Sequence, residues 1–330
     1  MTNNTNSSGR VTIGIPTRNR CELVIRAVRS VLAQTYTNVE IVVSDNASTD
    51  DTVKSIEEIG DSRVVLVKQT ENIGMAGNFN ACLNKASGEL FLMLSDDDVL
   101  EPDAIKELSH PFFNPPQSMP AESVGMVWCP CAIINADEET LYITEGGPAR
   151  ETVAELLAEV FNGHRGMRFS SVLVRTADAR IVGGYRGDRY GVLCDSPNWG
   201  QAALRHDYAV CIDRALAKYT IHTSSESSKS TCRDWQNWGN HIHADLMTAV
   251  REQGDRNGEK LMLAAHRNLI ANLTLTILMQ VVGQPGWIGY FIREIFHARK
   301  YLLTISTARR LIQEGWKIVF LKRRKKSRVS

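Results

Sequence analysis

The chain has 330 residues, of which 43% are hydrophobic, and it carries a formal net charge of +1. This length allows one large α/β domain with an appendage, or two ordinary domains. The near-neutral charge gives no ground for expecting a nucleic-acid partner, so electrostatic arguments rest on local clusters.

The cysteines and the apolar segments indicate the compartment. Seven cysteines, an odd number without a C-x-x-C pair, favour a reducing compartment over a disulfide framework. The first nine residues, MTNNTNSSG, are polar and lack the apolar region of a secretory signal, so we expect a disordered leader. The longest apolar stretch, residues 269–282, is shorter than the roughly 20 residues of a membrane-spanning helix. We therefore expect a cytoplasmic protein without a membrane span.

The first hundred residues alternate short apolar runs with longer amphipathic ones. Strands are predicted at residues 11–15, 40–44, 64–68 and 89–95, with helices between them. Because the runs are apolar throughout, they indicate a parallel sheet covered by helices on both faces. Ligands of such a sheet bind at the carboxyl ends of its strands.

The second half has a mixed pattern. A serine-rich linker at 224–230 separates predicted strands from a region that we expect to be helical to the C-terminus. The expected features before the linker are a strand over 124–134, a hairpin through 137–139, and strands near 170–174, 209–212 and 216–222.

Three adjacent carboxylates, Asp96, Asp97 and Asp98, follow the fourth predicted strand. Their repulsion requires either a divalent cation or screening by solvent. Mn²⁺ and Mg²⁺ prefer such oxygen ligands, and an ion held here would also stabilise a diphosphate leaving group. The alternative is an acidic helix N-terminus at the surface, and these three residues alone do not decide between the two.

Other polar residues follow the strands or begin the helices. Asp45, at the end of the second strand, either accepts a hydrogen bond from a nucleobase or ribose or is an ordinary turn residue. Asn72, Gly74 and Asn78 fit a ligand-binding turn and helix face, but they also fit ordinary loop chemistry. Taken singly, each of these residues favours the structural explanation.

In order and spacing, four segments resemble family 2 glycosyltransferases of the GT-A fold. The segments are VTIGIPTRNR, SDNASTDDT, ENIGMAGNFNACLNKASGE and MLSDDDVLEPD, which together cover roughly residues 10–110. The resemblance implies a Rossmann-like α/β fold with a mostly parallel sheet, helices on both faces, and here a C-terminal helical extension. The residues that the resemblance assigns to the nucleotide-sugar site are Pro16, Thr17, Asn19, Asp45, Asn72, Gly74, Asn78 and Asp96.

The resemblance also implies a metal site for Mn²⁺ or Mg²⁺. Asp96 would lie near the ribose, and Asp97 or Asp98 would bind the ion. Two positions depart from the common family pattern. Asn46 replaces a second Asp, and Ser95 replaces the first Asp of the metal motif.

An acidic residue is expected about a hundred residues after the metal motif, before a helix of the acceptor region. Asp195 fits and would be the general base, although it also fits a helix N-terminal carboxylate. Asp188 is the second candidate, and Cys194 stands where many relatives have Glu. His222, after the last predicted strand, would touch the metal or the diphosphate, or it is an ordinary polar residue.

The C-terminal sequence LKRRKKSR holds six basic residues and follows an apolar segment. Such a tail is typical of a membrane-surface segment, to which anionic headgroups contribute about 1 kcal/mol per basic residue. A solvated basic tail is an equal alternative, and nucleic-acid binding ranks third because no recognition module accompanies the charge. Upstream, His241 and His243 lack zinc-site companions and are expected to face solvent.

The resulting hypothesis is an inverting, non-processive, metal-dependent glycosyltransferase. It would transfer a sugar from a nucleoside diphosphate donor, specifically a UDP-sugar, to a hydroxyl of a saccharide or lipid-linked acceptor in surface polysaccharide or lipopolysaccharide synthesis. The alternatives are a nucleotide-sugar-binding module without turnover and a nucleotidyltransferase, although GIPTRNR lacks the Gly-rich loop of the latter. The expected organisation is a leader (1–9), a GT-A domain (10–223) divided into nucleotide-sugar (10–110) and acceptor (111–223) halves, and a helical region with a basic tail (224–330).

Overall fold

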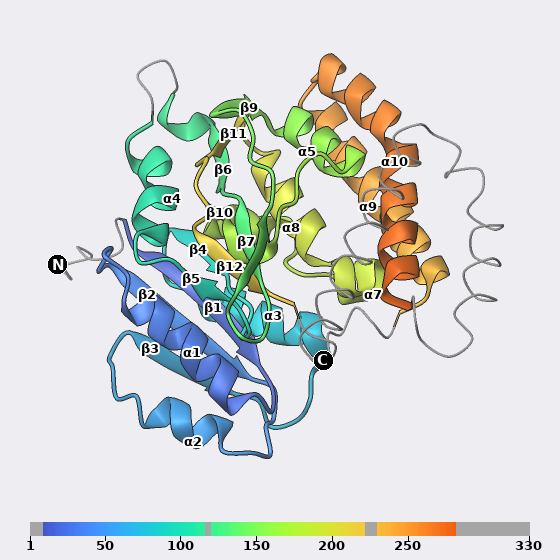
Figure 1. The fold of residues 1–330 in the computed structure, drawn as a ribbon. Coiled ribbons are helices and arrows are strands. Elements are labelled where there is room, and N and C mark those ends of the chain that lie inside the picture. Colours follow the sequence, from blue (N-terminus) through green and yellow to red (C-terminus); the bar gives the residue numbers. More distant parts are fainter. Residues whose placement is uncertain (1–8, 116–119, 222–229, 282–330) are drawn as a thin grey trace, which may run out of the picture.

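The computed structural model describes residues 9–115, 120–221 and 230–281. Strands and helices alternate in the amino-terminal half, as the sequence predicts (Figure 1). The elements of this half are β1 (Val11–Thr17), α1 (Cys21–Leu32), β2 (Val39–Asp45), α2 (Thr52–Glu57), β3 (Val64–Lys68), α3 (Gly74–Lys85), β4 (Leu90–Met93), β5 (Val99–Leu100) and α4 (Ala104–Phe113).

The carboxyl-terminal half adds short strands and then helices. A 3₁₀ turn, η2 (Phe169–Ser171), precedes one of these strands. The other elements are β6 (Val124–Trp128), β7 (Cys131–Ile134), β8 (Thr140–Ile143), β9 (Arg150–Thr152), α5 (Val153–Asn162), β10 (Val172–Arg175), α6 (Thr176–Ile181), α7 (Gly187–Tyr190), α8 (Asp195–Ala203), β11 (Tyr208–Cys211), β12 (Ala217–Thr220), α9 (Cys232–Glu252) and α10 (Arg256–Val281).

The main sheet has the strand order β3-β2-β1-β4-β10-β6-β11-β9. Strands β1 to β4 are parallel to one another, which confirms the predicted parallel sheet. Strand β10 runs antiparallel between β4 and β6, and β11 is parallel to β6. The sheet is therefore mostly parallel, and the carboxyl ends of β1, β2 and β4 lie at one edge.

A second, four-stranded sheet has the order β5-β12-β7-β8. The single strand predicted over 124–134 is wrong, because β6 ends at Trp128 in the main sheet and β7 begins at Cys131 in the second sheet. Pro130 lies in the break, where it cannot donate to a strand ladder. The predicted hairpin after β7 is confirmed, since β7 and β8 pair antiparallel around residues 135–139.

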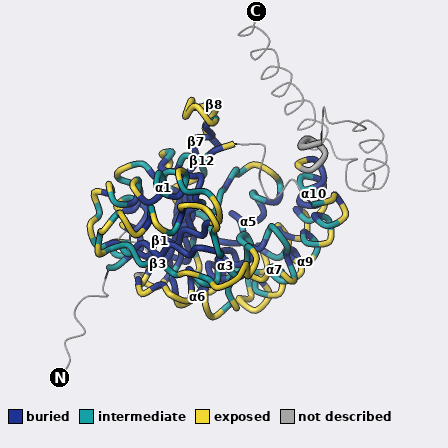
Figure 2. The backbone as a smooth tube through the Cα atoms, turned by 90° about the horizontal axis from the view of Figure 1, so that it is seen from below, coloured by how far each residue is buried: buried dark blue, intermediate teal, exposed yellow. Residues whose placement is uncertain are grey.

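Helices cover both faces of the main sheet. Along β2, Ile41 and Val43 pack in one core cluster with α1 and α4, whereas Val42 packs in the other cluster with α3, α5 and α8. This alternation follows from the two-residue repeat of a strand. Figure 2 shows the buried residues concentrated along these strands, while β8 projects from the body and is largely exposed.

The two C-terminal helices belong to the same packed body. They lie beside α5 and α8 (Figure 1), and Ile242, Leu246 and Leu269 share a core cluster with these helices. Among the helices of the described residues, none combines the length and hydropathy that crossing a bilayer requires.

The expectation that both histidines of α9 face solvent is wrong for one of them. His241 is exposed, but His243 is only 8% exposed and stacks on His266 of α10 with 4.1 Å between ring centroids. The wrong inference came from zinc-ligand spacing, which says nothing about the apolar face of a helix.

Candidate functional site

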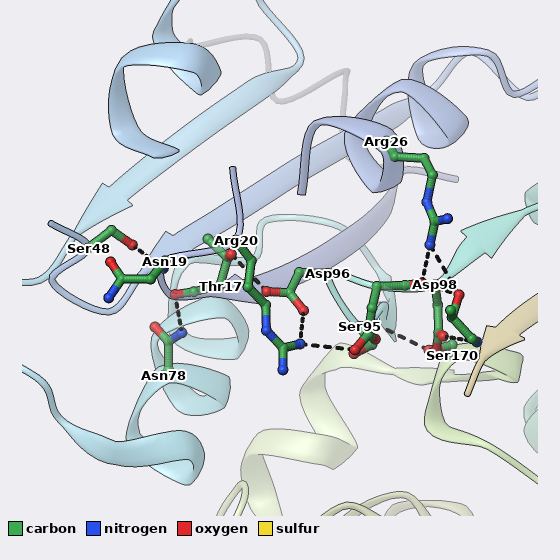
Figure 3. A network of polar contacts seen from close by, with 12 residues as sticks. Thr17, Asn19, Arg20, Arg26, Ser48, Asn78, Ser95, Asp96, Asp98 and Ser170 are labelled. Carbon is green, nitrogen blue, oxygen red and sulfur yellow. Dashed lines mark hydrogen bonds and ion pairs between the residues drawn. The ribbon is translucent and has the colours of Figure 1, made fainter. Parts of the chain in front are cut away.

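Asp96 and Asp97 converge on one cation at the carboxyl end of β4. The Nη1 atom of Arg20 donates to Asp96 Oδ1 at 2.8 Å and to Asp97 Oδ2 at 2.9 Å. The Thr17 hydroxyl, at the end of β1, donates to Asp96 Oδ2 at 2.8 Å, as Figure 3 shows. Both aspartates are more than nine-tenths buried. The alternative of a surface acidic helix N-terminus is therefore excluded, and β5 rather than a helix follows the turn.

Asp98 has a different environment from its two neighbours. It is fully buried, its Oδ2 accepts from the Ser170 hydroxyl at 2.6 Å, and its Oδ1 accepts from the Thr220 backbone N–H at 3.0 Å. The Thr220 hydroxyl also donates to the Asp97 carbonyl, as does Arg26. Two segments distant in sequence, η2 and β12, thus anchor the aspartate turn, and both Asp98 oxygens already have protein donors.

The crowded carboxylates have perturbed acidities. Burial raises the pKa of Asp96 to about 6, against the opposing charge of Arg20. Burial and the charge of Asp97 raise the pKa of Asp98 to about 8. Because desolvation disfavours the ionised forms, added positive charge would stabilise this turn.

The end of β2 holds the second group of polar side chains. Asp45 is 2% exposed, and its Oδ2 accepts from the Ser48 backbone N–H at 3.0 Å. Its Oδ1 is buried and has no hydrogen-bond partner within the described ranges. An orphaned carboxylate oxygen is costly in a folded protein, so it suits a ligand N–H or O–H.

The loop before α3 is held by Asn46, to which the sequence assigned no role. Its Nδ2 donates to Asn72 Oδ1 at 2.8 Å, and its Oδ1 accepts from the Ile73 backbone N–H at 2.8 Å. Asn72 also accepts from the Gly74 N–H, and Gly74 adopts φ +75°, a conformation that glycine tolerates. Asn72 therefore shapes this edge through its side-chain oxygen, and Gly74 through its backbone conformation.

The side chains of Asn19 and Asn78 form hydrogen bonds that link the carboxyl-terminal ends of β1 and β2. Asn19 Oδ1 accepts from the Thr49 N–H at 2.7 Å, and Asn78 Nδ2 donates to the carbonyls of Thr17 and Ser44 at 3.3 and 3.0 Å. Pro16 is buried within β1. The predicted nucleotide-sugar residues therefore lie at the ends of β1, β2 and β4 and in the adjoining start of α3, some as candidate contacts and some as supports.

Asp195 is the first residue of α8. Desolvation raises its pKa, against the neighbouring charge of Arg168. The Arg168 guanidinium lies over the Tyr219 ring, 5.0 Å from its centroid. Desolvation and the charges of Asp98, Asp97 and Asp195 raise the pKa of Tyr219 to about 12. Tyr219 adjoins Thr220, which donates to Asp98, so its ring lies between the aspartate turn and Arg168.

The two remaining predicted residues fall elsewhere. Asp188, the second candidate base, lies on α7, where its 72% exposed side chain pairs with Arg186 at 3.2 Å. His222 lies outside the described residues, so its assignment to the metal stays a prediction.

Sequence reasoning missed the side chains that hold the site together. Arg20 lies in the PTRNR segment, just after the first predicted strand. Its positive charge, at the same edge of the sheet as three aspartates, was the signal that could have revealed the ion pair. The hydroxyl donors Ser170 and Thr220 had no such signal, because η2 and β12 approach the turn only in the folded chain. The missed residues are Arg20, Arg26, Arg168, Ser170, Tyr219 and Thr220.

The donor set fits a divalent ion at Asp97. Its carboxylate and that of Asp96 already surround one cationic nitrogen, and oxygen ligands suit Mg²⁺ or Mn²⁺. Within the described residues, no three His, Cys, Asp or Glu side chains form a metal-binding group. An ion here would therefore need ligands beyond this pair, which a bound diphosphate and water can supply.

Residues 12–121 match the model of glycosyl transferase family 2. An Escherichia coli UDP-Glc:alpha-D-GlcNAc-diphosphoundecaprenol beta-1,3-glucosyltransferase, WfaP, is 40% identical over 27% of this chain and 35% of its own length. An uncharacterized Mycobacterium tuberculosis protein is 32% identical over 68% of this chain and 72% of its own length. The chain spans only 28% to 47% of the length of WfaP and three other curated relatives.

Two solved structures share the fold at low sequence identity. Staphylococcus aureus TarS 1–349 in complex with UDP-GlcNAc has a TM-score of 0.64 at 16% identity, covering 88% of this chain and 81% of that one. The Pyrobaculum calidifontis mannosyltransferase PcManGT with GDP-Man and Mn²⁺ has a TM-score of 0.55 at 17% identity, covering 93% and 84%. With the motifs, the family match and the sheet topology in agreement, the chain belongs to glycosyl transferase family 2 and has the GT-A fold.

Proposed function

We propose that this protein transfers one sugar from a nucleoside diphosphate sugar, specifically a UDP-sugar, to a hydroxyl group of an acceptor, with inversion at the anomeric carbon. The observation that carries the proposal is the position of Tyr219. Its neighbour Thr220 donates to Asp98, and its ring centroid lies 5.0 Å from the guanidinium of Arg168, which lines one cavity together with Ser196, the residue after Asp195. A donor held at the aspartate turn and an acceptor held at Asp195 would then meet in one space. Such juxtaposition is what a single displacement requires.

Different residues of the chain would bind different parts of the donor. The unpartnered Oδ1 of Asp45 would accept a hydrogen bond from the base, and Asp96 would face the ribose. Asp97 would bind the ion, because both oxygens of Asp98 already accept hydrogen bonds from Ser170 and Thr220. Asp98 would accordingly support the turn rather than ligate. Mn²⁺ or Mg²⁺, when bound, would stabilise the negative charge of the departing diphosphate.

Asp195 would act as the general base. It would accept the proton of the acceptor hydroxyl while that oxygen forms a bond to the anomeric carbon. The bond between this carbon and the diphosphate oxygen breaks in the same step, and its electron pair leaves with the nucleoside diphosphate. A carboxylate with a raised pKa is a stronger base, as this task requires.

The setting follows from relatives and from the sequence. WfaP is named as a UDP-Glc transferase acting on a diphosphoundecaprenol-linked sugar, which supports a UDP-sugar donor and a lipid-linked saccharide acceptor here. We place the reaction in bacterial surface polysaccharide assembly on the cytoplasmic side of the membrane. The basic C-terminal residues, which lie outside the described ranges, would bind anionic headgroups.

Substitution of Asp195 by Asn tests the base directly. We expect the transfer rate to fall by roughly 10²- to 10⁴-fold, while calorimetric binding of the donor with Mn²⁺ stays unchanged. Asp188→Asn, which removes an exposed carboxylate of the same region, is the matched control and should retain activity. Full activity of the Asp195 variant would contradict the assignment of the base.

The pH profile gives a second test of the same residue. A base must be ionised, so the transfer rate of the native protein should fall as the pH drops through the raised pKa of Asp195. The Asp195→Asn variant should lose this dependence in its residual activity. If the transfer rates of both proteins fell identically toward acidic pH, the titrating group would be a residue other than Asp195.

Product stereochemistry and metal-dependent binding separate the proposal from its rivals. The anomeric proton of the product, observed by NMR, should show inversion. A nucleotide-sugar-binding module without turnover would bind the donor with Mn²⁺ but release no nucleoside diphosphate in the presence of acceptors. A nucleotidyltransferase would instead release pyrophosphate from a nucleoside triphosphate.

A further inference from the structure

Arg26 of α1 is a second arginine at the aspartate turn, and its contacts differ from those of Arg20. Its Nη2 atom donates to the Asp97 backbone carbonyl and, at 3.1 Å, to the Thr220 hydroxyl. Figure 3 shows its guanidinium extending from α1 toward the turn. Arg20, by contrast, pairs with the carboxylates of the turn. Arg26 therefore holds the backbone at Asp97 and leaves the carboxylate of that residue to other partners.

The second sheet brings the supports of the aspartate turn together. Strand β5 follows the turn directly and pairs with β12, which pairs in turn with β7. In this register Thr220 lies beside Ile134, the last residue of β7, so it adjoins the hairpin turn at residues 135–139. The Thr220 hydroxyl accepts from Arg26 and donates to the Asp97 carbonyl. The Asp97 carbonyl thus has two donors, which fix the orientation of its peptide group.

Glu138, in the turn of the β7–β8 hairpin, holds the other end of the Arg26 guanidinium. Arg26 Nη1 donates to Glu138 Oε1 at 3.1 Å, although the two residues are 112 positions apart in sequence. Their side chains are 25% and 62% exposed, so the ion pair contributes little to the free energy of folding. Its effect is on direction, because the guanidinium is planar: with Nη1 held by Glu138, Nη2 is aimed at the Asp97 carbonyl.

Glu138 has a backbone conformation that glycine usually adopts. Its φ is +60°, and its N–H donates to the Asn135 carbonyl at 3.0 Å to close the turn. The Asn135 side-chain oxygen accepts from the N–H groups of Asp137 and Glu139 at 3.0 and 2.9 Å. The left-handed position that ends a short hairpin loop favours Gly, because a Cβ atom is strained there. A glutamate at this position therefore makes the turn less stable than glycine would.

Positive φ angles of non-glycine residues occur at three positions of the described ranges. Two of them, Asn19 and Ala47, follow β1 and β2 at the edge where the donor is proposed to bind. Strained backbone of this kind persists where surrounding contacts require it, and it concentrates in functional sites. Glu138, the third, is distant from both in sequence but is connected to the same edge through Arg26.

We propose that Glu138 and Arg26 are positioning residues for the divalent-ion site. Glu138 orients the Arg26 guanidinium, and the guanidinium fixes the Asp97 peptide so that the Asp97 carboxylate faces the ion and the diphosphate. This assignment rests on the proposed function and deepens it, because a hairpin of the acceptor half then supports the ion site of the donor half. Groups that orient a metal ligand without touching the metal change metal affinity or activity by roughly 10- to 100-fold when they are removed.

Glycine at position 138 separates this role from a structural one. Glu138→Gly removes the carboxylate and relieves the positive φ, so its thermal unfolding temperature should be equal to or higher than that of the native chain. Calorimetric titration with UDP should show binding at least about fivefold weaker in the presence of Mn²⁺ and unchanged in its absence. A lower unfolding temperature with unchanged UDP binding would identify a merely stabilising ion pair and overturn the proposal.

Asp137→Gly is the matched control, because it makes the same substitution at an exposed residue of the same turn. Asp137 contributes its backbone N–H to the turn, and glycine keeps that group. The Mn²⁺-dependent binding of UDP by this variant should equal that of the native chain. Equal weakening in the Asp137 and Glu138 variants would assign the effect to the turn as a whole and contradict the role of the Glu138 carboxylate.

Substitution of Arg26 tests whether the two residues act in series. Arg26→Met should weaken Mn²⁺-dependent UDP binding by about tenfold or more, whereas Arg29→Met, at an exposed position of the same helix, should have no effect. Adding Glu138→Gly to Arg26→Met should cause no further loss, because Glu138 acts through the guanidinium. Additive losses would refute that connection. If Arg26→Met does not fold, the Glu138 and Asp137 variants still decide the question.

The native chain distinguishes failure of this assignment from failure of the proposed function. If it binds neither UDP nor another nucleoside diphosphate with Mn²⁺, the proposed function fails and the assignment fails with it. If it binds UDP with Mn²⁺ and Glu138→Gly binds equally well, only the assignment of Glu138 and Arg26 fails.

Discussion

Arg20 lies between Asp96 and Asp97, where the proposed divalent ion would also have to bind. Its single Nη1 atom lies 2.8 and 2.9 Å from their oxygens, and its side chain is 27% exposed. The arginine therefore neutralises the turn in the absence of a divalent ion. The ion pair between Arg20 and Asp97 must break if a divalent ion is to bind to Asp97.

Replacement of Arg20 by Met should tighten the binding of Mn²⁺ in the absence of nucleotide. Removing a competing partly exposed ion pair is worth about 1 kcal/mol, or roughly fivefold in affinity. Calorimetric titration with Mn²⁺ measures the change. Arg18→Met, two residues earlier at an exposed position, is the control. Weaker Mn²⁺ binding by the Arg20 variant would show that the arginine assists the ion rather than competing with it.

The roles of several single residues could not be predicted from the sequence. The sequence shows that Asp96, Asp97 and Asp98 are adjacent, but it does not show which of them is available to a ligand. That depends on hydrogen bonds from Ser170 and Thr220, more than 70 positions away. Asn46 looked like a lost carboxylate, yet its amide both donates and accepts in the 72–74 loop. An Asp there would provide only acceptors.

At the scale of elements, the first four strands were predictable because each is continuously apolar and fully flanked by helices. The strand over 124–134 was not, since a run of apolar residues does not reveal that the chain changes sheets at residues 129–130. Short strands such as β9 and β12 take their positions from partners distant in sequence. Propensity alone cannot supply those partners.

The contact between α9 and α10 contains a stacked histidine pair, in which His243 is buried and His266 is partly exposed. Burial and the neighbouring His266 lower the pKa of His243 to about 4, and its Nε2–H donates to the Met262 carbonyl at 3.1 Å. The unfolded chain has the higher pKa and binds more protons between pH 6.5 and 4. The free energy of unfolding should therefore fall as the pH drops through this window, by up to about 3 kcal/mol.

His243→Gln keeps a hydrogen-bond donor but removes the titrating ring. Denaturant unfolding at pH 7 and pH 4.5 should show a smaller loss of stability in this variant than in the native protein. His241→Gln, at the exposed neighbouring histidine, should behave like the native protein. Equal losses of stability in all three proteins would show that the His243 ring is not the cause.

At the scale of the whole molecule, the C-terminal helices complete the core. Ile242, Leu246 and Leu269 share an apolar cluster with α5 and α8, so the boundary proposed at residue 223 separates segments that pack as one body. A chain ending at 223 would expose that face of α5 and α8 to water. The helical extension was predictable from its apolar stripes, but its partner helices were not.

Truncation tests this dependence. We expect residues 1–223 alone to lose cooperative thermal unfolding and to bind a hydrophobic dye, because the apolar surface left by α9 and α10 is uncovered. Removal of only residues 322–330 should leave the unfolding temperature unchanged while weakening attachment to vesicles that contain anionic lipid. Native-like unfolding of the 223-residue chain would establish the boundary as a true domain boundary.

The hydrogen bonds from η2 and β12 to Asp98 make the first half of the chain, which matches the family model, dependent on the second half. A chimera that grafts residues 10–110 onto the acceptor region of another family member inherits the carboxylates without their donors, unless hydroxyl and amide groups recur at equivalent points. We therefore expect residues 10–110 of this chain to function in a chimera only when the segments that donate to Asp98 are transferred with them.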